Sequence, residues 1–224
     1  MLKKPRIILV ITHKETNAQI KRHAVNCLEI RADLLPKLSP AILVKEITKR
    51  KPLKLPILLT VRNARQEGAD ADFSDEKKWA LINEALPLVD EIDIELSSAL
   101  LKPTVALAHR LKKKVIVSSH HFKSMPHQDM LDEIRRKAKA AGADSIKIAA
   151  MANTLTELQR LIKFTQEHQD ENVVTMAMGK YGRLSRLTLP LFGSLGIYTF
   201  IGQPKAPGQI DIKTLTDHLR FYYP

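Results

Sequence analysis

The stretch Ala143-Asp144-Ser145-Ile146-Lys147-Ile148-Ala149-Ala150-Met151 has the composition of a buried strand with one lysine at its centre. An ammonium group in such a run reaches out to water, pairs with a carboxylate, or loses its proton more easily than an exposed lysine does. A lysine that loses its proton readily is a nucleophile that can form a Schiff base with a ketone. Taken alone, the stretch favours the ion pair, because buried charges usually exist as pairs.

Strand-like and helix-like segments alternate on both sides of this stretch, with short connections between them. Strands are predicted at residues 7–12, 28–33, 57–62, 91–96, 115–120, 143–151, 173–178 and 196–201. Helices are predicted at residues 16–26, 40–50, 75–86, 104–113, 129–141, 155–168, 182–187 and 211–222. Eight such units without an internal repeat or a linker predict a (β/α)8 barrel, the TIM-barrel fold, with residues 1–224 as a single catalytic domain.

Several of these strands carry polar residues on one face, although strands in parallel sheets usually read as continuous apolar runs. Successive side chains of a strand point to opposite sides, so the polar residues of each strand share a side. The sets are Glu29, Arg31 and Asp33; Thr60 and Arg62; Glu91, Asp93 and Glu95; Ser118 and His120; and Ser145, Lys147 and Ala149. The apolar residues are expected under the helices, which leaves a charged barrel interior. That much interior charge indicates a site, with Asp93 and Glu95 expected in a structural ionic network.

The position of the polar residues along the strands also points to a site, because active sites of this fold lie at the carboxyl ends of the strands. Four of them fall in the second half of their strands: Arg31, Arg62, His120 and Lys147. The small neighbours Ser145 and Ala149 leave room for a ligand beside the lysine. This combination predicts anion-binding arginines, an acid–base histidine and an amine nucleophile, and it favours a Schiff-base enzyme.

The two consecutive histidines are separated by the same alternation, which places His120 inside with Ser118 and His121 at the start of the following loop. The remaining histidines are dispersed without the spacing of metal ligands, so no metal site is expected. Cys27, the only cysteine, excludes an intramolecular disulfide and is interpreted as a small buried hydrophobic residue.

The net charge of +12, from 36 basic and 24 acidic residues, raises the question of nucleic-acid binding. The basic runs at 49–51, 112–114 and 135–137 lie on predicted helices or their ends, and aromatic residues make up only 5% of the chain. No nucleic-acid partner is therefore expected. No apolar run approaches the roughly 18 residues of a membrane span, and the basic start at 1–6 leads into a strand without a signal-peptide core. A cytoplasmic protein without membrane contact is expected.

A series of short motifs spans nearly the whole chain in a fixed order. They are LEIRAD at 28–33, TVR at 60–62 with EG at 67–68, IDIEL at 92–96, SSHHF at 118–122, KIA at 147–149, MAMGK at 176–180, SRL at 185–187, FGS at 192–194 and APGQ at 206–209. No single motif is decisive, but together they are highly specific. The chain resembles the type I 3-dehydroquinate dehydratases, the Schiff-base lyases of the shikimate pathway.

This resemblance implies a cofactor-free dehydration of 3-dehydroquinate to 3-dehydroshikimate by syn elimination, the third step of aromatic amino acid biosynthesis. Lys147 would form the imine with the C3 ketone. His120 would remove a proton from C2 and later protonate the departing C1 hydroxyl, and Glu67 would orient and polarise that histidine. The resemblance also implies a homodimer and a small-molecule substrate as the only other partner.

The resemblance assigns further residues to substrate binding. Arg186 would bind the substrate carboxylate, Gln209 would lie on the loop that closes over the substrate, and Glu29, Arg31 and Arg62 would position the ring hydroxyls. The family often has serine where Lys205 stands, and Lys205 itself can meet the carboxylate. The loop after Arg62 is one residue longer than the family pattern, so Gln66 competes with Glu67 as the partner of His120; Glu67 is preferred because it precedes a glycine and a carboxylate orients an imidazolium better.

Two other functions are compatible with parts of the sequence. A class I aldolase also uses a lysine in a barrel, but phosphorylated substrates call for a glycine-rich phosphate site after the seventh and eighth strands. That region here contains MGKYG at 178–182 and Ser185-Arg186 instead of a clear glycine cradle. A nucleic-acid-binding module would rest on the net charge alone, and it predicts appreciable binding at physiological salt.

Overall fold

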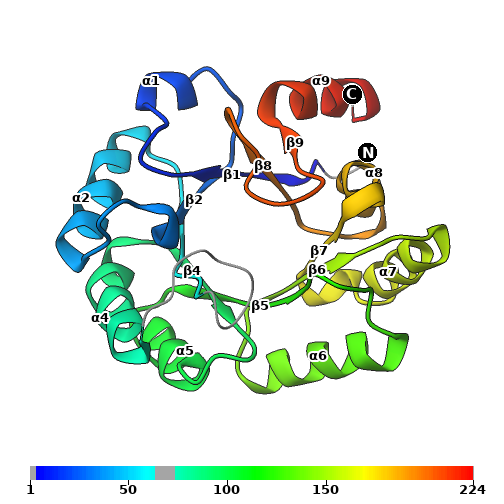
Figure 1. Ribbon diagram of the computed structural model, residues 1–224, viewed down its shortest axis with the longest axis horizontal. Coiled ribbons are helices and arrows are strands. Elements are labelled where there is room, and N and C mark those ends of the chain that lie inside the picture. Colours follow the sequence, from blue (N-terminus) through cyan, green and yellow to red (C-terminus); the bar gives the residue numbers. More distant parts are fainter. Residues whose placement is uncertain (1–3, 64–73, 224) are drawn as a thin grey trace.

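The computed structural model describes residues 4–63 and 74–223, and one curled sheet of parallel strands forms its centre (Figure 1). The strands are β1 (Arg6–Ile11), β2 (Cys27–Arg31), β3 (Ile57–Thr60), β4 (Glu91–Glu95), β5 (Lys114–His121), β6 (Ser145–Met151), β7 (Val173–Met178), β8 (Gly196–Phe200) and β9 (Ile210–Asp211). Their order in the sheet is β7-β6-β5-β4-β3-β2-β1-β8-β9. Strands β1 to β8 follow one another around a ring, which confirms the predicted (β/α)8 barrel.

The ring meets itself where β7 and β8 approach each other. The backbone N–H of Leu195, just before β8, donates to the carbonyl of Val173 at the start of β7 at 2.9 Å. The Ser194 hydroxyl accepts a hydrogen bond from the N–H of Thr175 at 3.0 Å. These contacts join the two strands although no regular ladder pairs them in the described sheet.

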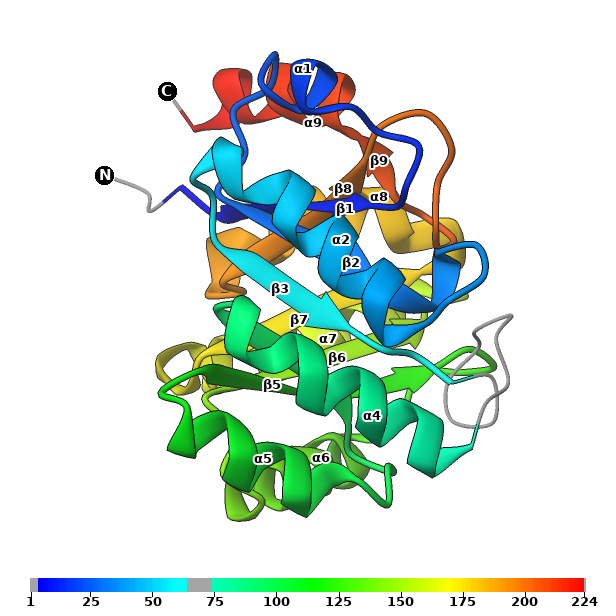
Figure 2. The ribbon, with the colours of Figure 1, turned by 90° about the vertical axis from the view of Figure 1, so that its left-hand side faces the viewer.

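Helices surround the sheet on its outside, as Figures 1 and 2 show. They are α1 (Asn17–Ile20), α2 (Pro40–Arg50), α4 (Asp75–Ala85), α5 (Leu101–Arg110), α6 (Gln128–Ala140), α7 (Leu155–Glu167), α8 (Gly182–Thr188) and α9 (Ile212–Tyr222). Apolar side chains, mostly leucine, isoleucine and valine, fill the layer between helices and strands; Leu43, Ile47 and Leu81 belong to it, together with Phe164. None of the helices in the described part of the chain has the length and apolar character that a membrane span requires.

Local sequence signals explain where several helices begin. Ser39 caps α2 by accepting a hydrogen bond from the N–H of Ile42, and Pro40 occupies the first helical position. Thr154 and Glu157 form a reciprocal capping box at the start of α7. These caps satisfy amide groups that would otherwise lack partners, and they therefore fix where the two helices begin. The predicted starts at residues 40 and 155 agree with the structure.

The first helix is much shorter than the predicted range of residues 16–26. It ends at Ile20 because the chain must turn back to lie beside β1. Asn26 exchanges hydrogen bonds with Ile7 there: the Ile7 N–H donates to the Asn26 side-chain oxygen at 2.8 Å, and the Asn26 N–H donates to the Ile7 carbonyl at 2.9 Å. Residues 21–26 therefore form the connection from α1 to β2 and do not extend the helix.

The barrel interior is divided into an apolar layer and a polar layer, which refines the expectation of a charged interior. Ile8, Cys27, Leu58, Ile116 and Val174 belong to a buried apolar cluster inside the ring. Burial raises the pKa of the Cys27 thiol to about 12, so this cysteine is an inert part of the layer. The polar side chains that follow on the same strand faces lie toward the carboxyl ends, where they form the candidate site.

The connection from β8 to the short strand β9 arches over this end of the barrel (Figure 2). Gly208 adopts a positive φ of 77° and approaches Gly182 of α8 closely. A Cβ atom on Gly208 would lie 2.6 Å from the Cα atom of Gly182, so any larger residue would push the loop away from α8. The sequence did not predict β9, because two residues give no periodic signal.

Candidate active site

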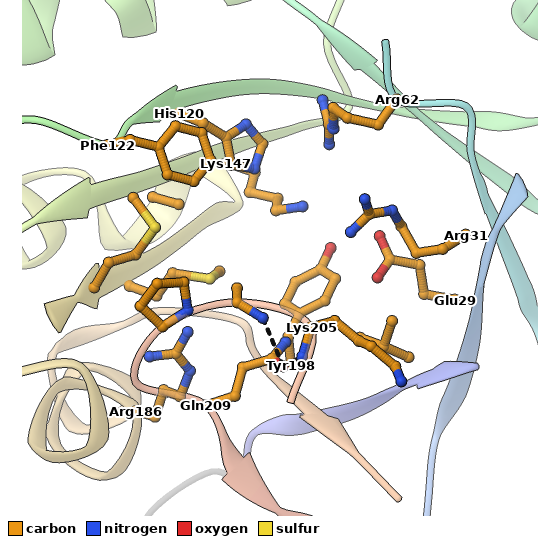
Figure 3. Close-up of a pocket in the computed structure, with 16 residues that line it drawn as sticks. Glu29, Arg31, Arg62, His120, Phe122, Lys147, Arg186, Tyr198, Lys205 and Gln209 are labelled. Carbon is orange, nitrogen blue, oxygen red and sulfur yellow. Dashed lines mark hydrogen bonds between the residues drawn. The ribbon is translucent and has the colours of Figure 1, made fainter. Parts of the chain in front are cut away.

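A cavity of about 160 Å³ opens at the carboxyl ends of the strands (Figure 3). Eight of the predicted site residues line it: Glu29, Arg31, Arg62, His120, Lys147, Arg186, Lys205 and Gln209. The ninth, Glu67, and its competitor Gln66 lie outside the described residues. Side chains that are far apart in the chain therefore meet in one pocket because parallel strands bring their carboxyl ends to the same edge of the barrel.

Lys147 is both an ion-pair partner and part of the pocket wall. It lies within β6 with only 5% of its surface exposed, and its Nζ donates to Oδ2 of Asp93 at 2.9 Å. The strand neighbour Ala149 also lines the cavity and leaves space beside the amine. The ion pair that the sequence offered as an alternative to a catalytic role thus exists, and it holds the amine at the edge of the cavity.

Asp93 is the centre of the charged network beneath the pocket. Its Oδ1 accepts hydrogen bonds from Arg62 Nη2 at 2.9 Å and from the Ser118 hydroxyl at 2.6 Å. Burial alone would raise the pKa of Asp93, but the positive charges of Arg62 and Lys147 outweigh it and hold the pKa below its usual range. A permanent carboxylate at this position fixes the orientation of both cations.

The network continues outward from Arg62 to helix α4. Arg62 Nη1 lies 3.2 Å from Oε1 of Glu95, and the buried Lys78 Nζ donates to Oε2 of Glu95 at 2.6 Å. The sequence predicted Glu95 in a structural network, and its side chain is buried beside these two cations. Glu95 therefore orients Arg62 without lining the cavity.

Arg31 and Glu29 form the part of the wall that β2 contributes. Arg31 forms a bidentate pair with Asp33, with Nε–Oδ1 and Nη2–Oδ2 distances of 2.9 and 2.6 Å. The Thr60 hydroxyl donates to Oε1 of Glu29 at 2.7 Å. Both residues line the cavity, so they present a guanidinium edge and a carboxylate oxygen to a ligand.

His120 faces the cavity from the end of β5, and its ring stacks at 6.1 Å on the ring of Phe122. Burial and the positive charges of Arg62 and Lys147 lower the pKa of His120 well below its usual value. The imidazole is therefore neutral at physiological pH and can accept a proton. His121 points away from the cavity and contacts the Ser119 hydroxyl at 2.9 Å, as the alternation of the strand predicts.

Arg186 lies on α8 at the opposite side of the cavity. Its Nη1 donates to the carbonyls of Ala177 and Gly182 at 2.9 and 2.8 Å, while its Nε has no hydrogen-bond partner among the described residues. Within that part of the chain no carboxylate pairs with it, and burial lowers its pKa to about 10. A buried guanidinium without a counter-charge is a strong site for an anionic group of a ligand.

The loop between β8 and β9 supplies Lys205 and Gln209. The Gln209 side-chain oxygen accepts hydrogen bonds from the backbone N–H groups of Lys205 and Ala206 at 2.6 and 3.2 Å (Figure 3). This leaves the Gln209 amide nitrogen available to a ligand. The loop thus closes on itself and carries two further polar groups to the rim of the cavity.

The structure also adds a residue to the site that the sequence left out. Asp93, expected in the ionic network, pairs with both Arg62 and Lys147, and the Ser118 hydroxyl accepts a hydrogen bond from Arg62 Nη1 at 3.0 Å. The added residue is Tyr198 of β8, which lines the cavity with its ring centre 4.4 Å from Lys147 Nζ. Tyr198 lies in an apolar strand, so no alternation of polar and apolar residues marked it as a site residue. The available signal was its position on the face of that strand that points into the barrel. Across residues 4–63 and 74–223, no cluster of three or more potential metal ligands occurs.

The fold and the pocket together define a class: a (β/α)8 barrel with a polar cavity built around a buried lysine. Comparisons with known proteins give the family. The model of type I 3-dehydroquinase matches residues 7–224. A 3-dehydroquinate dehydratase of Klebsiella pneumoniae is 39% identical over 171 residues, which are 73% of this chain and 68% of the relative.

Two longer matches agree with this result. A 3-dehydroquinate dehydratase of Methanococcoides burtonii is 32% identical over 218 residues, covering 95% of this chain and 92% of the relative. The crystal structure of 3-dehydroquinate dehydratase from Geobacillus kaustophilus superposes with a TM-score of 0.88 at 25% identity, covering 99% of this chain and 93% of the other. The chain belongs to the type I 3-dehydroquinase family of enzymes.

Proposed function

We propose that this protein dehydrates 3-dehydroquinate to 3-dehydroshikimate in aromatic biosynthesis through an imine on Lys147. Family membership supports the overall reaction. The observation that carries the mechanism is the position of the buried Lys147 amine, which borders the same cavity as the neutral His120 and the guanidinium of Arg186. A ketone carboxylate substrate finds there a nucleophile, a base and an anion site.

The first step joins the substrate to the protein. The Lys147 nitrogen bonds to C3, the C3 oxygen leaves as water, and the product is a protonated imine. A protonated imine withdraws electrons from C2 more strongly than a ketone does, which acidifies the C2 protons. Asp93, 2.9 Å from the amine, supplies the carboxylate that stabilises the positive charge during this step.

The second step is the elimination. The neutral His120 takes a proton from C2, the electrons of that C–H bond form the C1–C2 double bond, and the C1 hydroxyl leaves with the proton that His120 returns. Both transfers by one residue imply a syn elimination. General acid–base catalysis of this kind is typically worth roughly 10²–10⁴-fold. Hydrolysis of the imine then releases 3-dehydroshikimate and restores Lys147.

The remaining polar residues bind the substrate. Arg186 takes the carboxylate, because it is the buried guanidinium without a carboxylate partner among the described residues. Glu29, Arg31 and Arg62 bind the ring hydroxyls, and Lys205 and Gln209 cover the substrate from the β8–β9 loop. Glu67 is proposed to orient His120, with Gln66 as the alternative that mutagenesis has to exclude.

The other functions considered from the sequence are less well supported. An aldolase would share the lysine, but the family match and the carboxylate-binding position of Arg186 favour the dehydratase. The net charge of +12 remains the only feature in favour of nucleic-acid binding. A cytoplasmic location and a homodimer are kept as predictions, and size-exclusion chromatography with light scattering tests the dimer.

The test is an assay of the conjugated enone product by ultraviolet absorbance, with 3-dehydroquinate as the substrate. Wild type is expected to form the product, and Lys147→Ala is expected to lose the activity by roughly 10⁴-fold or more, since the nucleophile is gone. Lys163→Ala, at a lysine whose side chain is 66% exposed, is the matched control and should retain wild-type activity. Absence of product with wild type would refute the function; full activity of Lys147→Ala would refute the mechanism.

A further inference from the structure

The Tyr198 hydroxyl is a buried polar group that the proposed mechanism does not use. The residue is 3% exposed, lines the cavity, and its hydroxyl has no hydrogen-bond partner among the described residues. Figure 3 shows the phenol oxygen directed into the cavity between Lys147 and the side chains of Glu29 and Arg31. Native proteins seldom leave such a group unsatisfied, so a partner that arrives with the ligand is the simplest explanation.

The position of Tyr198 relative to Lys147 identifies the part of the ligand that it meets. Lys147 Nζ lies 4.4 Å from the centre of the phenol ring. A ligand carbon bonded to Nζ, and the atoms next to that carbon, therefore lie close to the phenol. In 3-dehydroquinate the bonded carbon is C3, and its neighbours are C2 and C4.

Chemistry separates these two neighbours. C2 carries only hydrogens and belongs to the side of His120, which removes one of them in the proposed elimination. C4 carries a hydroxyl, which can both accept and donate a hydrogen bond. The C3 oxygen is not a lasting partner, because it leaves as water when the imine forms.

The phenol is suited to donate to this hydroxyl. Burial and the negative charges of Glu29 and Asp93 raise the pKa of Tyr198 well above its usual value. The group therefore remains a neutral O–H donor throughout the physiological range and does not act as a proton shuttle.

We propose that the Tyr198 hydroxyl donates a hydrogen bond to the C4 hydroxyl of the imine-bound substrate, and that it selects ketones with a hydroxyl beside the carbonyl. The inference rests on the proposed function. A buried hydroxyl that gains its partner only from the correct substrate discriminates against analogues that lack that partner, because their binding leaves the hydroxyl unsatisfied.

The test compares Tyr198→Phe with wild type on 3-dehydroquinate and on its 4-deoxy analogue. The variant keeps the ring beside Lys147 and removes only the hydroxyl. On 3-dehydroquinate, kcat/KM is expected to fall by roughly 3- to 10-fold, the range for one neutral hydrogen bond. On the 4-deoxy analogue the variant and wild type should agree within about twofold. Tyr222→Phe, at an exposed tyrosine, is the matched control and should change neither value.

Thermal unfolding without substrate provides a second readout. Removal of an unsatisfied buried hydroxyl should leave the Tm of Tyr198→Phe equal to or above that of wild type. An equal loss of kcat/KM on both substrates, or no loss on 3-dehydroquinate, would overturn the inference while leaving the proposed function intact. A wild-type protein without activity on 3-dehydroquinate would instead overturn the proposed function, and the inference with it.

Discussion

Two walls of the same cavity hold their polar groups in opposite ways. On the ion-paired wall, formed by β2 to β6, the cations Arg31, Arg62 and Lys147 each have a carboxylate partner within 2.9 Å. On the partner-poor wall, formed by α8 and β8, Arg186 has only backbone carbonyls and the Tyr198 hydroxyl has no partner among the described residues. The first wall is complete by itself, whereas the second is complementary to groups that a ligand brings.

This difference indicates a division of labour. Paired charges are fixed in place before the substrate arrives, which is what electrostatic stabilisation of a changing charge distribution requires. Buried polar groups without partners cost free energy until a ligand satisfies them, so they favour binding of a molecule with a matching anion and hydroxyl. The ion-paired wall is therefore expected to determine chemistry and stability, and the partner-poor wall is expected to determine affinity and selectivity.

The largest expected effect on the ion-paired wall comes from its base. His120→Ala should lower kcat by roughly 10²–10⁴-fold, because the proton transfers at C2 and C1 lose their donor and acceptor. His121→Ala is the matched control: it changes the neighbouring imidazole, which contacts Ser119 and lies outside the cavity, and it should alter kcat only slightly. Steady-state kinetics on both variants checks the assignment, and a larger loss in His121→Ala would reverse it.

Asp93→Asn should break the ion-paired wall itself. Arg62 and Lys147 would remain buried beside a neutral amide, which is expected to lower the free energy of unfolding by about 3–5 kcal/mol. Asp217→Asn removes an exposed carboxylate paired with Lys213 and should change stability by less than about 1 kcal/mol. Urea unfolding measures both, and equal losses would show that the buried network contributes no more than a surface pair.

Arg186→Lys should affect the partner-poor wall, with its main effect on KM. A lysine keeps the charge but lacks the planar fork that binds a carboxylate, so KM for 3-dehydroquinate should rise by roughly 10- to 100-fold. The exposed neighbour Arg183 on the same helix gives the control Arg183→Lys, which should leave KM unchanged. If Arg186→Lys lowered kcat with KM unchanged, the carboxylate would have to bind elsewhere.

The smallest expected effect concerns pH. The pKa of His120 is lowered in the folded protein, so the imidazole stays neutral as the pH falls to 6.5, its usual pKa. The acid limb of kcat/KM should therefore begin below about pH 6.5. Stability depends on pH in the same direction. Below about pH 6.5, His120 binds a proton in the unfolded chain but not in the folded protein, so the free energy of unfolding decreases as the pH is lowered. A pH–rate profile with an acid inflection at or above 6.5 would contradict the assignment.

The two walls also differ in how far the sequence predicted them. The two-residue spacing of Glu29 and Arg31, and of Ser118 and His120, revealed the inward faces, because the two-residue period of a strand is visible in the chain. The pairing of Lys147 with Asp93 was not predicted as such, since periodicity gives the face of a residue and not its partner. The sequence assigned a role to Lys147 and a role to Asp93. Their contact depends on how β4 and β6 are placed in the barrel, which strand periodicity does not give.

The partner-poor wall gave weaker signals. Arg186 and Gln209 were found only through resemblance, because α8 and the β8–β9 loop have no periodic polar pattern. Tyr198 was missed because a phenol in an apolar strand resembles a core residue, and the lack of a partner for its hydroxyl among the described residues is a tertiary property. Helix α1 was predicted too long, since the hydrogen bonds of Asn26 to β1 are tertiary contacts.

The proposed mechanism requires Lys147 to form an imine with the substrate ketone. Borohydride added during turnover of 3-dehydroquinate reduces such an imine to a stable secondary amine. We expect inactivation, an intact-mass increase equal to one reduced adduct per chain, and a modified peptide in which Lys147 carries the adduct. Continued turnover without any adduct, or an adduct located on a different lysine, would contradict it.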